Sequence, residues 1–242
     1  NCKINLNQIF IFKYDGSEIP SEKNKGLKLR RGNTGLISLD EDMYIKKKTA
    51  LIAAVEKENI EIVKILLKSE EIDVNIPRLI YIEEYINGHG VEETALQIAV
   101  ENQNEEMVKL LLSVDNINPN LKKLFNYEGS RWGGTITTLN SAIKKENIVI
   151  VKLLLSSNKV DINEYSMERA EKRWTRAVTA LHMAIEKSFN EIVKILLESD
   201  KIDPNIYTIE GHYDNMCQIL QNTWLVNIVK LETPLHIAIR KK

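Results

Sequence analysis

The sequence predicts an all-α repeat solenoid, made of helix-turn-helix units with extended β-hairpin inserts between them. Three observations lead to this class. A Thr-x-Leu-x-x-Ala pattern opens four complete units and a fifth partial one. A Val-Lys-x-Leu-Leu run follows in each complete unit. An asparagine then closes each complete unit, always 26 residues after its threonine. Repetition at a fixed internal spacing is typical of arrays whose units bury their apolar faces against their neighbours.

Each unit opens with a threonine that we expect to cap a short first helix. Its hydroxyl can accept a hydrogen bond from a backbone N–H that the first turn leaves unpaired. Pro234 of the fifth unit falls at the first helical position, where proline is tolerated. The alanine five residues after each threonine allows a neighbouring unit to approach closely. The opening threonines are Thr49, Thr94, Thr137, Thr179 and Thr233.

The Val-Lys-x-Leu-Leu run predicts a second, more apolar helix. In the first unit Ile62, Val63, Leu66 and Leu67 follow helical spacing, and Lys64 falls between them on the side expected to face solvent. One such helix pair cannot bury its own apolar face. Stacking of the units therefore has to supply the continuous core.

The pattern divides the chain into six segments. Residues 1–48 hold the end of a preceding unit and a long basic insert, because Ile4-Asn5-Leu6-Asn7 resembles the closing segment Ile117-Asn118-Pro119-Asn120. Residues 233–242 begin a truncated fifth unit. We therefore expect further repeats of the same chain on both sides. The four complete units with their hairpins span residues 49–93, 94–136, 137–178 and 179–232.

Composition and charge argue against several classes of protein. The 33 Lys and Arg residues nearly balance the 34 Asp and Glu residues, so the chain lacks the strongly basic field that nucleic-acid binding needs. No stretch reaches the roughly 18 to 20 apolar residues of a membrane span. Cys2 and Cys217 have no metal or disulfide-framework spacing, which favours a reducing, intracellular compartment, cytoplasmic or cytoskeletal.

Three segments together resemble the ankyrin repeat. They are Thr-Pro-Leu-His-Ile-Ala at 233–238, Asn-Glu-Ile-Val-Lys-Ile-Leu-Leu at 190–197 and Ile-Asp-Pro-Asn at 202–205. The resemblance implies an L-shaped stack of helix pairs, with β-hairpins projecting at right angles, that works in protein recognition. It also implies that His182 and His236 have a structural role, bonding to the threonine that opens their unit.

The chain departs from the family pattern at two kinds of position. The histidine that follows Thr-Pro-Leu in the family is replaced by Ile52, Gln97 and Asn140 in the first three units. We expect these changes to weaken local turns and caps without altering the apolar pattern. The glycine expected in the turn between the two helices is replaced in every complete unit, by Glu58, Gln103, Glu146 and Ser188.

The segments between units are enlarged and rich in aromatic residues. Successive threonines are 45, 43, 42 and 54 residues apart, against about 33 in a plain ankyrin unit. Aromatic side chains dominate interface energetics, so those in the inserts are candidate anchors for a partner. An equally good interpretation is that they pack the hairpins against one another. The candidate anchors are Tyr81, Tyr85, Phe125, Tyr127, Trp132, Trp174, Tyr207 and Trp224.

Two inserts carry local structural signals. In the first, 79–82 and 85–86 are composed of strand formers, and Asn87-Gly88-His89-Gly90 supplies turn residues. In the last, we expect a short helix over 214–221, followed by an apolar strand over 224–229. An exposed strand of that kind would favour pairing with another chain.

The function expected from these features is a non-catalytic scaffold or adaptor that binds protein partners through hairpin tips and the concave helix face. The alternative is an architectural component of a cytoskeletal assembly, such as a microtubule-associated one, or of another permanent, multi-subunit assembly. A targeting or regulatory part of a larger enzyme is a third reading. We expect no catalytic activity, cofactor or metal site, because no nucleophile, acid-base pair or ligand cluster accompanies the isolated His89 and His212.

Overall fold

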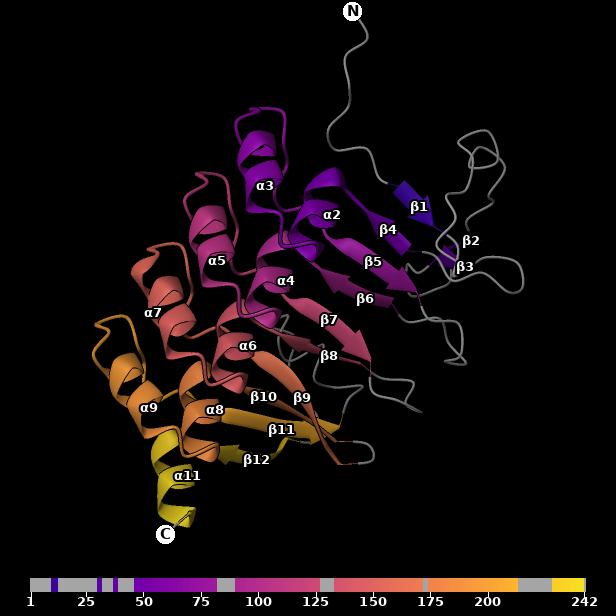
Figure 1. The fold of residues 1–242 in the computed structure, drawn as a ribbon. Coiled ribbons are helices and arrows are strands. Elements are labelled where there is room, and N and C mark those ends of the chain that lie inside the picture. The colour runs from indigo at the N-terminus through magenta and orange to yellow at the C-terminus, as the bar shows by residue number, and fades with distance from the viewer. Residues whose placement is uncertain are drawn as a thin grey trace, which may run out of the picture.

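The chain folds into a row of stacked helix pairs beside a sheet (Figure 1). The computed structural model describes residues 10–12, 30–31, 37–38, 46–81, 90–126, 133–171, 174–212 and 228–241. The first helices are α2 (Ala50–Glu56), α4 (Ala95–Glu101), α6 (Thr138–Lys144), α8 (Ala180–Glu186) and α11 (Pro234–Arg240). The second helices are α3 (Ile60–Leu66), α5 (Glu105–Leu112), α7 (Ile148–Ser156) and α9 (Asn190–Leu197).

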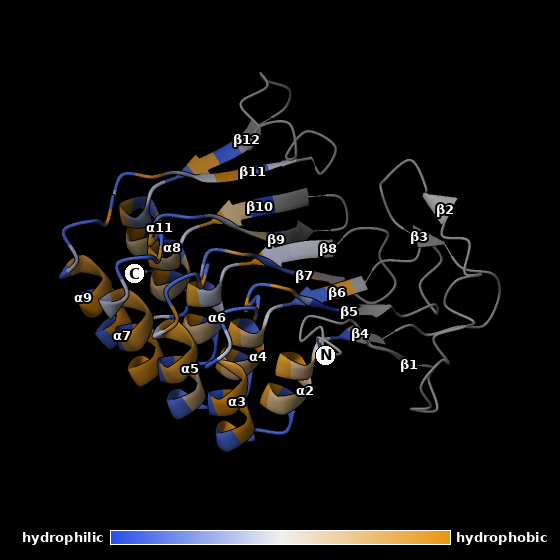
Figure 2. Ribbon diagram, turned by 90° about the horizontal axis from the view of Figure 1, so that it is seen from above, coloured by the Kyte–Doolittle hydropathy of each residue, from blue (hydrophilic) through white to orange (hydrophobic). Residues whose placement is uncertain are grey.

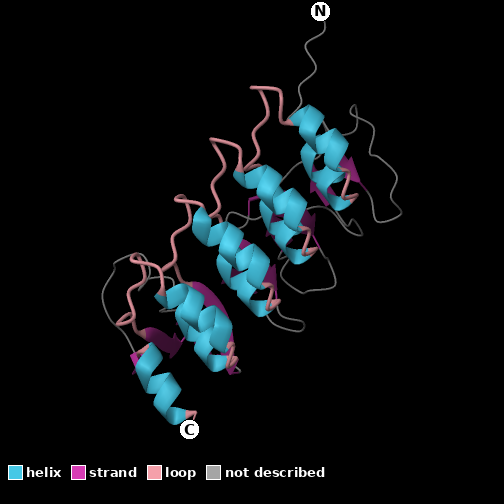
Figure 3. Cartoon of the chain, turned by 60° about the vertical axis from the view of Figure 1, so that its left-hand side comes forward, coloured by secondary structure: helices cyan, strands magenta, loops and turns pink. Residues whose placement is uncertain are grey.

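The helix pairs stack in a row (Figure 3). One continuous apolar core runs through them. Leu96, Ala99 and Val100 of α4 are buried, as are Met107, Val108 and Leu111 of α5. Each first helix also packs against the first helix of the next repeat. The core is therefore shared between units, as the repeat pattern predicts for a solenoid.

Threonines begin the first helices. The hydroxyl of Thr49 accepts a 3.2 Å hydrogen bond from the backbone N–H of Ile52, and Thr137 accepts a 3.1 Å bond from Asn140. Asparagines begin three of the second helices in the same way, with Asn59, Asn104 and Asn147 each accepting a 3.0 Å bond. These bonds satisfy backbone donors that a helix cannot satisfy internally.

The turn between the two helices has the same backbone geometry in all four complete repeats. Glu58, Gln103, Glu146 and Ser188 have φ values of 53°, 55°, 56° and 60°. In the second repeat the N–H of Gln103 bonds to the carbonyl of Val100, and that of Asn104 to the carbonyl of Ala99. This is the Schellman arrangement, in which glycine is the least strained residue.

Asparagines link successive repeats on the side of the second helices. The side chain of Asn75 donates to the carbonyl of Asn116 and accepts from the N–H of Asn118, both at 2.8 Å. Asn163 makes the same pair of bonds to Lys201 and Asp203. In the first three repeats the closing asparagine thereby fixes the position of the next loop.

The strands form a ten-stranded antiparallel sheet in the order β1-β4-β5-β6-β7-β8-β9-β10-β11-β12, with a separate pair β2-β3. The all-α class expected from sequence is therefore incomplete, because the strands pair across repeats into a second layer. Their bounds are β1 (Phe10–Phe12), β2 (Arg30–Arg31), β3 (Ile37–Ser38), β4 (Lys46–Lys48), β5 (Arg78–Tyr81), β6 (Gly90–Glu93), β7 (Lys123–Asn126), β8 (Gly133–Ile136), β9 (Ser166–Glu171), β10 (Trp174–Val178), β11 (Thr208–His212) and β12 (Ile228–Glu232).

At the helix end of the strands the pairing is the same in every repeat, although β9-β10 and β11-β12 shift register further out. The residue three positions after the closing asparagine pairs with the residue that precedes the next threonine, as in Arg78 with Glu93 and Lys123 with Ile136. Phe10 pairs with Lys48 in this manner, and Phe10 lies three positions after Asn7. The pair β1-β4 thus has the register of a hairpin that precedes the first complete repeat.

Two local expectations differ from the structure, and two others fall wholly or largely outside the described residues. Gly90, expected in a turn, lies in β6 opposite Tyr81, because the common register places the second strand directly before Thr94. Ile62, expected in the core, is exposed, because no described helix precedes α3 in the row of second helices. The helix expected over 214–221 lies outside the described residues, and only the end of the strand expected over 224–229 falls within β12.

Candidate binding surface

The first helices separate the second helices from the strands, and the strands extend to one side (Figure 2). This arrangement gives two surfaces that a partner could reach. The inner face is the corner between the first helices and the sheet. The outer face is the opposite side of the sheet.

Ion pairs line the inner face in the first two repeats. Arg78 of β5 bonds to Glu93 of β6, with Nε 2.9 Å from Oε2, and also to Glu56 at the end of α2. Lys123 of β7 contacts the same Glu93 and lies 3.3 Å from Glu101 of α4. Glu93 is only 3% exposed. A buried carboxylate needs partners of this kind, because desolvating an unpaired charge is costly.

Glu101 connects this network to the third repeat. Its carboxylate accepts from Lys123 and lies 3.2 Å from Nζ of Lys145. Burial alone would raise the pKa of Glu101, but the two lysines outweigh burial and lower the pKa below its usual value. The carboxylate therefore stays ionised and fixes the two cations across the repeat boundary.

The third repeat replaces charges with neutral hydrogen bonds. The hydroxyl of Ser166 accepts from the N–H of Thr137 at 3.0 Å and from Nδ2 of Asn140 at 2.8 Å. Ser166 thus accepts from the N–H of Thr137, whereas in the second repeat Gln97 accepts from the corresponding N–H of Thr94. Ion pairs return between the third hairpin and the fourth repeat, where Arg176 of β10 bonds to Glu186 of α8 at 2.6 Å and to Glu168 of β9 at 3.4 Å.

His182 is held between the first helix of the fourth repeat and β12. The N–H of Thr179 donates to Nδ1 at 3.3 Å, and the threonine hydroxyl lies 2.8 Å from the same nitrogen. Because Nδ1 accepts, the ring proton belongs on Nε2, which lies 3.3 Å from the carbonyl oxygen of Glu232. Burial lowers the pKa of His182 and outweighs the backbone carbonyl that favours protonation. Neutral His182 is therefore a structural link between repeats.

Gln97 occupies the same slot in the second repeat and makes equivalent contacts. Its Oε1 accepts from the N–H of Thr94 at 2.8 Å, and its Nε2 donates to the carbonyl of Leu121. His236 bonds to Thr233 in the fifth repeat, with Nδ1 3.2 Å from the backbone nitrogen. An amide and an imidazole can therefore serve the same purpose at this position.

The outer face carries a row of directly paired residues that crosses eight strands, β5 to β12. Arg78 contacts α2, and side chains alternate along a strand, so Leu79 and the residues of β6 to β12 paired in turn with it face away from the helices. Leu124 and Leu231 of this row are exposed. The row consists of Leu79, Glu92, Leu124, Thr135, Met167, Ala177, Ile209 and Leu231.

A small apolar cluster interrupts this row. Met167 and Ala177 are buried there, and Tyr165 and Ile209 pack against them. The hydroxyl of Tyr165 donates a 2.9 Å bond to the carbonyl of Tyr207, and burial raises the pKa of Tyr165. The side chains of this cluster therefore cover part of the outer face. Tyr207 remains exposed at the edge of the cluster.

Three of the candidate anchors lie on strands, Tyr207 lies directly before β11, and the other four lie outside the described residues. Tyr81, Phe125 and Trp174 lie on β5, β7 and β10, but the structure describes the side chain of Tyr207 alone among the eight. The sequence reasoning missed Leu124, Leu231 and the ion pairs of the inner face. Charged residues just before Thr49, Thr94 and Thr233 were the available signal. Tyr85, Tyr127, Trp132 and Trp224 lie outside the described residues.

The described residues contain no cluster of three or more His, Cys, Asp or Glu residues placed to hold a metal ion. Within the same part of the chain, no helix has the length and apolar character needed to cross a bilayer.

Stacked helix pairs with a shared core, repeated caps and a lateral sheet define a helical repeat array. The family model for ankyrin repeats matches three overlapping stretches, residues 29–123, 76–166 and 121–208. The chain belongs to the ankyrin repeat family. Repeats of this family are generally non-catalytic modules of protein–protein interaction.

A solved structure is similar in fold. It is the crystal structure of the ankyrin repeat domain of Bcl-3, described as a unique member of the IkappaB protein family. The TM-score is 0.50 at 20% sequence identity, and the match covers 80% of this chain and 66% of that chain, a little under two thirds. At this identity the likeness shows the fold alone. No curated protein matches the chain.

Proposed function

We propose that this chain is a scaffold or adaptor that binds protein partners through its hairpins, at their tips and on the outer face of the sheet, and through the inner face beside the first helices. The proposal also assigns partner contacts to the eight aromatic residues of the inserts. It places the chain inside the cell, in the cytoplasm or on the cytoskeleton, because Cys2 and Cys217 have the wide spacing usual in a reducing compartment.

The observation that supports the proposal is the exposure of apolar side chains on the sheet. Among the described residues, Leu124, Tyr207 and Leu231 are exposed on or beside strands, away from the main core. The polar groups of the inner face are largely paired with one another. A partner that covers the sheet would therefore bury apolar area and would leave the ion pairs intact.

Capture of partners by variant chains tests this proposal. A chain with Leu124→Asp, Tyr207→Ala and Leu231→Asp changes three exposed side chains of the sheet, and a chain with Trp132, Trp174 and Trp224 changed to alanine tests the inserts. Val149→Asp is the matched control, because Val149 is equally exposed but lies on the second helix α7. We expect the sheet variant and the tryptophan variant each to lose partners that the control retains. Undiminished capture by both would refute the proposal.

An architectural role in a permanent assembly is the second candidate. The observation that favours it is the exposure of Ile62 and Ile65 on α3, at one end of the described row of second helices. An exposed apolar helix face of this kind suits a surface that is joined to another unit. Partner capture that requires an assembled filament or complex, and not the isolated chain, would favour this role over the adaptor.

A further inference from the structure

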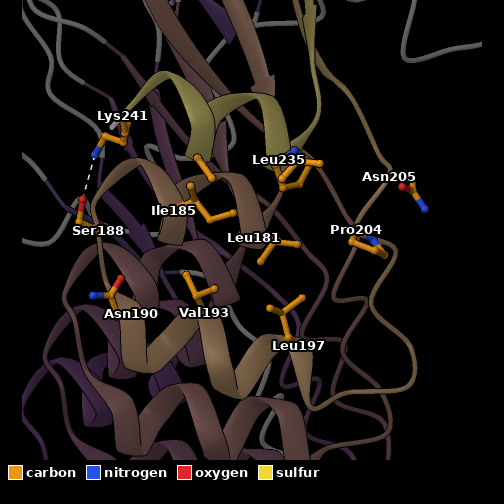
Figure 4. Close-up of a pocket in the computed structure, with 12 residues that line it drawn as sticks. Leu181, Ile185, Ser188, Asn190, Val193, Leu197, Pro204, Asn205, Leu235 and Lys241 are labelled. Atoms are coloured by element: carbon orange, nitrogen blue, oxygen red, sulfur yellow. Dashed lines mark hydrogen bonds between the residues drawn. The ribbon is translucent and has the colours of Figure 1, made fainter.

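Two cavities of the described region differ in the side chains that line them. The groove between α8, α9 and α11 is mainly apolar, with Leu181, Val193 and Leu235 on its surface (Figure 4). In the earlier repeats a second helix packs against the equivalent surface, so this groove belongs to the stacking of repeats. The other cavity has a volume of about 400 Å³ and lies on the inner face, between the second and third repeats. Three lysines line it, and we call it the cationic pocket.

The ends of two first helices and two strands form the cationic pocket. At about 30 Å³ for each water molecule, it holds on the order of ten waters, which is ample room for an acidic side chain. Nζ of Lys123 and Nζ of Lys145 lie 3.3 Å and 3.2 Å from the carboxylate of Glu101. This carboxylate therefore holds two of the three cations in place. The lining residues are Glu101 of α4, Lys123 of β7, Ile136 of β8, Lys144 of α6 and Lys145 directly after α6.

The third repeat lacks carboxylates that other repeats place at the corresponding positions. The seventh residue after the opening threonine is a glutamate in the first, second and fourth repeats, and each of these pairs with a lysine or arginine of a strand. In the third repeat this residue is Lys144. The residue before the threonine is Glu93 in the second repeat and Ile136 in the third. A cation and an apolar side chain thus replace two carboxylates at the pocket.

These replacements leave an excess of positive charge around the pocket. Lys144 is exposed and has no acidic partner among the described residues. Lys123 and Lys145 share Glu101, and the other carboxylate near Lys123 is Glu93, which also pairs with an arginine of β5. A carboxylate that enters the pocket would therefore meet one unpaired ammonium group and two that are already positioned, so little side-chain freedom is lost on binding.

We propose that the cationic pocket binds a glutamate or aspartate side chain from an acidic segment of a partner protein. The inference rests on the proposed function, because it names the chemistry of a partner at the inner face. The incoming carboxylate accepts hydrogen bonds from Nζ of Lys144 and Lys145, and its hydrocarbon part contacts Ile136. The partner thereby supplies the carboxylate that the third repeat lacks. Complementary charge of this kind selects partners and speeds their association.

A labelled oligoglutamate peptide is the probe, and an oligoglutamine peptide of equal length is its control. We expect the full chain to bind the acidic peptide saturably in fluorescence anisotropy, and added salt should weaken the binding. Lys144→Glu places in the pocket the carboxylate that neighbouring repeats carry, so it should weaken binding about tenfold or more. Lys152→Glu is the matched control, because it makes the same change in net charge at an exposed position of α7.

A second variant and a competitor complete the test. Lys144→Gln removes the charge without adding another, so it should weaken binding less than Lys144→Glu does. It also replaces Lys144→Glu if circular dichroism shows that variant to be unfolded. Inorganic phosphate, added at constant ionic strength, should not displace the peptide. Displacement would make the pocket a site for small anions and would overturn the proposal.

The remaining contradictory results are equally definite. They are an absence of saturable binding, equal binding of the glutamine peptide, and equal weakening by Lys144→Glu and Lys152→Glu. Each would show that the pocket does not select an acidic segment. Failure of the proposed function is a different result, because it is undiminished capture of partners by the sheet and tryptophan variants.

Discussion

The side-chain amide of Asn120 donates a 2.8 Å hydrogen bond to the carbonyl oxygen of Lys159, in the next repeat. Its Oδ1 accepts a second bond of 2.8 Å from the N–H of Asp161. Asn120→Ala removes both bonds, and at about 0.5 to 1.5 kcal/mol each we expect a loss of about 2 kcal/mol in the free energy of unfolding. Urea denaturation followed by circular dichroism measures this loss.

The control for this experiment is Asn205→Ala. Asn205 closes the fourth repeat, and its side chain makes no bond to a later loop among the described residues. The same substitution should therefore leave the urea midpoint almost unchanged. Equal losses in the two variants would show that the asparagines do not couple repeats.

The turn between the two helices should tolerate glycine better than its present residues. A non-glycine residue in the left-handed region costs about 1–2 kcal/mol, whereas glycine adds about 0.5–1 kcal/mol of unfolded-state entropy. We therefore expect Gln103→Gly, at φ 55°, to stabilise the chain by up to about 1 kcal/mol. Gln103→Val should destabilise it, since β-branched residues disfavour this region. Thermal unfolding of both variants is the check, and a destabilised glycine variant would contradict the geometry.

His182 should make stability depend on pH. Burial lowers the pKa of His182, whereas the unfolded residue keeps a value near 6.5. As the pH falls through about 6.5, the unfolded chain binds a proton before the folded chain does, so the free energy of unfolding decreases. Above that pH both states are neutral and the contribution is constant. Urea titrations between pH 8 and pH 5 would show the decrease.

His182→Gln is the matched variant for the pH experiment. Gln97 shows that glutamine makes equivalent bonds in this slot, so the variant should keep its stability at pH 8. It should lose less stability than the parent chain on acidification. If both lose the same amount, other groups are responsible for the pH dependence.

Removal of Glu93 should disrupt the inner face. Glu93→Ala leaves Arg78 with Glu56 as its remaining carboxylate partner. It leaves Lys123 with the more distant Glu101. Removing one partner of a buried ion pair typically costs about 3–5 kcal/mol, and we expect about 3 kcal/mol because second carboxylates remain. Glu61→Ala, which removes an exposed pair with Lys64 on α3, should leave the urea midpoint unchanged. Equal effects would argue against a stabilising network.

The order of helices could be predicted from sequence because local signals agreed there. Threonine caps, the alanine of the first helix and the Val-Lys-x-Leu-Leu run all indicated the same helix pair. The pattern also identified Glu58 and Gln103 as replacements for glycine, and both have positive φ values. The fold class was incomplete because pairing of strands across repeats depends on a shared register, as between Glu92 and Leu124, which local composition does not reveal.

The binding surface was harder to predict than the fold. Aromatic content drew attention to the inserts, yet the exposed apolar residues on the strands include Leu124 and Leu231, which are ordinary strand formers in the sequence. The pairing of Arg78 with both Glu56 and Glu93 brings together residues from three elements. Only the stacking of repeats places such residues side by side, so no motif in the sequence could show the network.

Hydrogen exchange of the chain with and without a captured partner tests the proposed mode of binding most directly. The account predicts slower exchange on binding in the strands β5 to β12 and in the first helices α4, α6 and α8, with no change in the second helices α5 and α7. Protection confined to the second helices, with the strands unaffected, would contradict it.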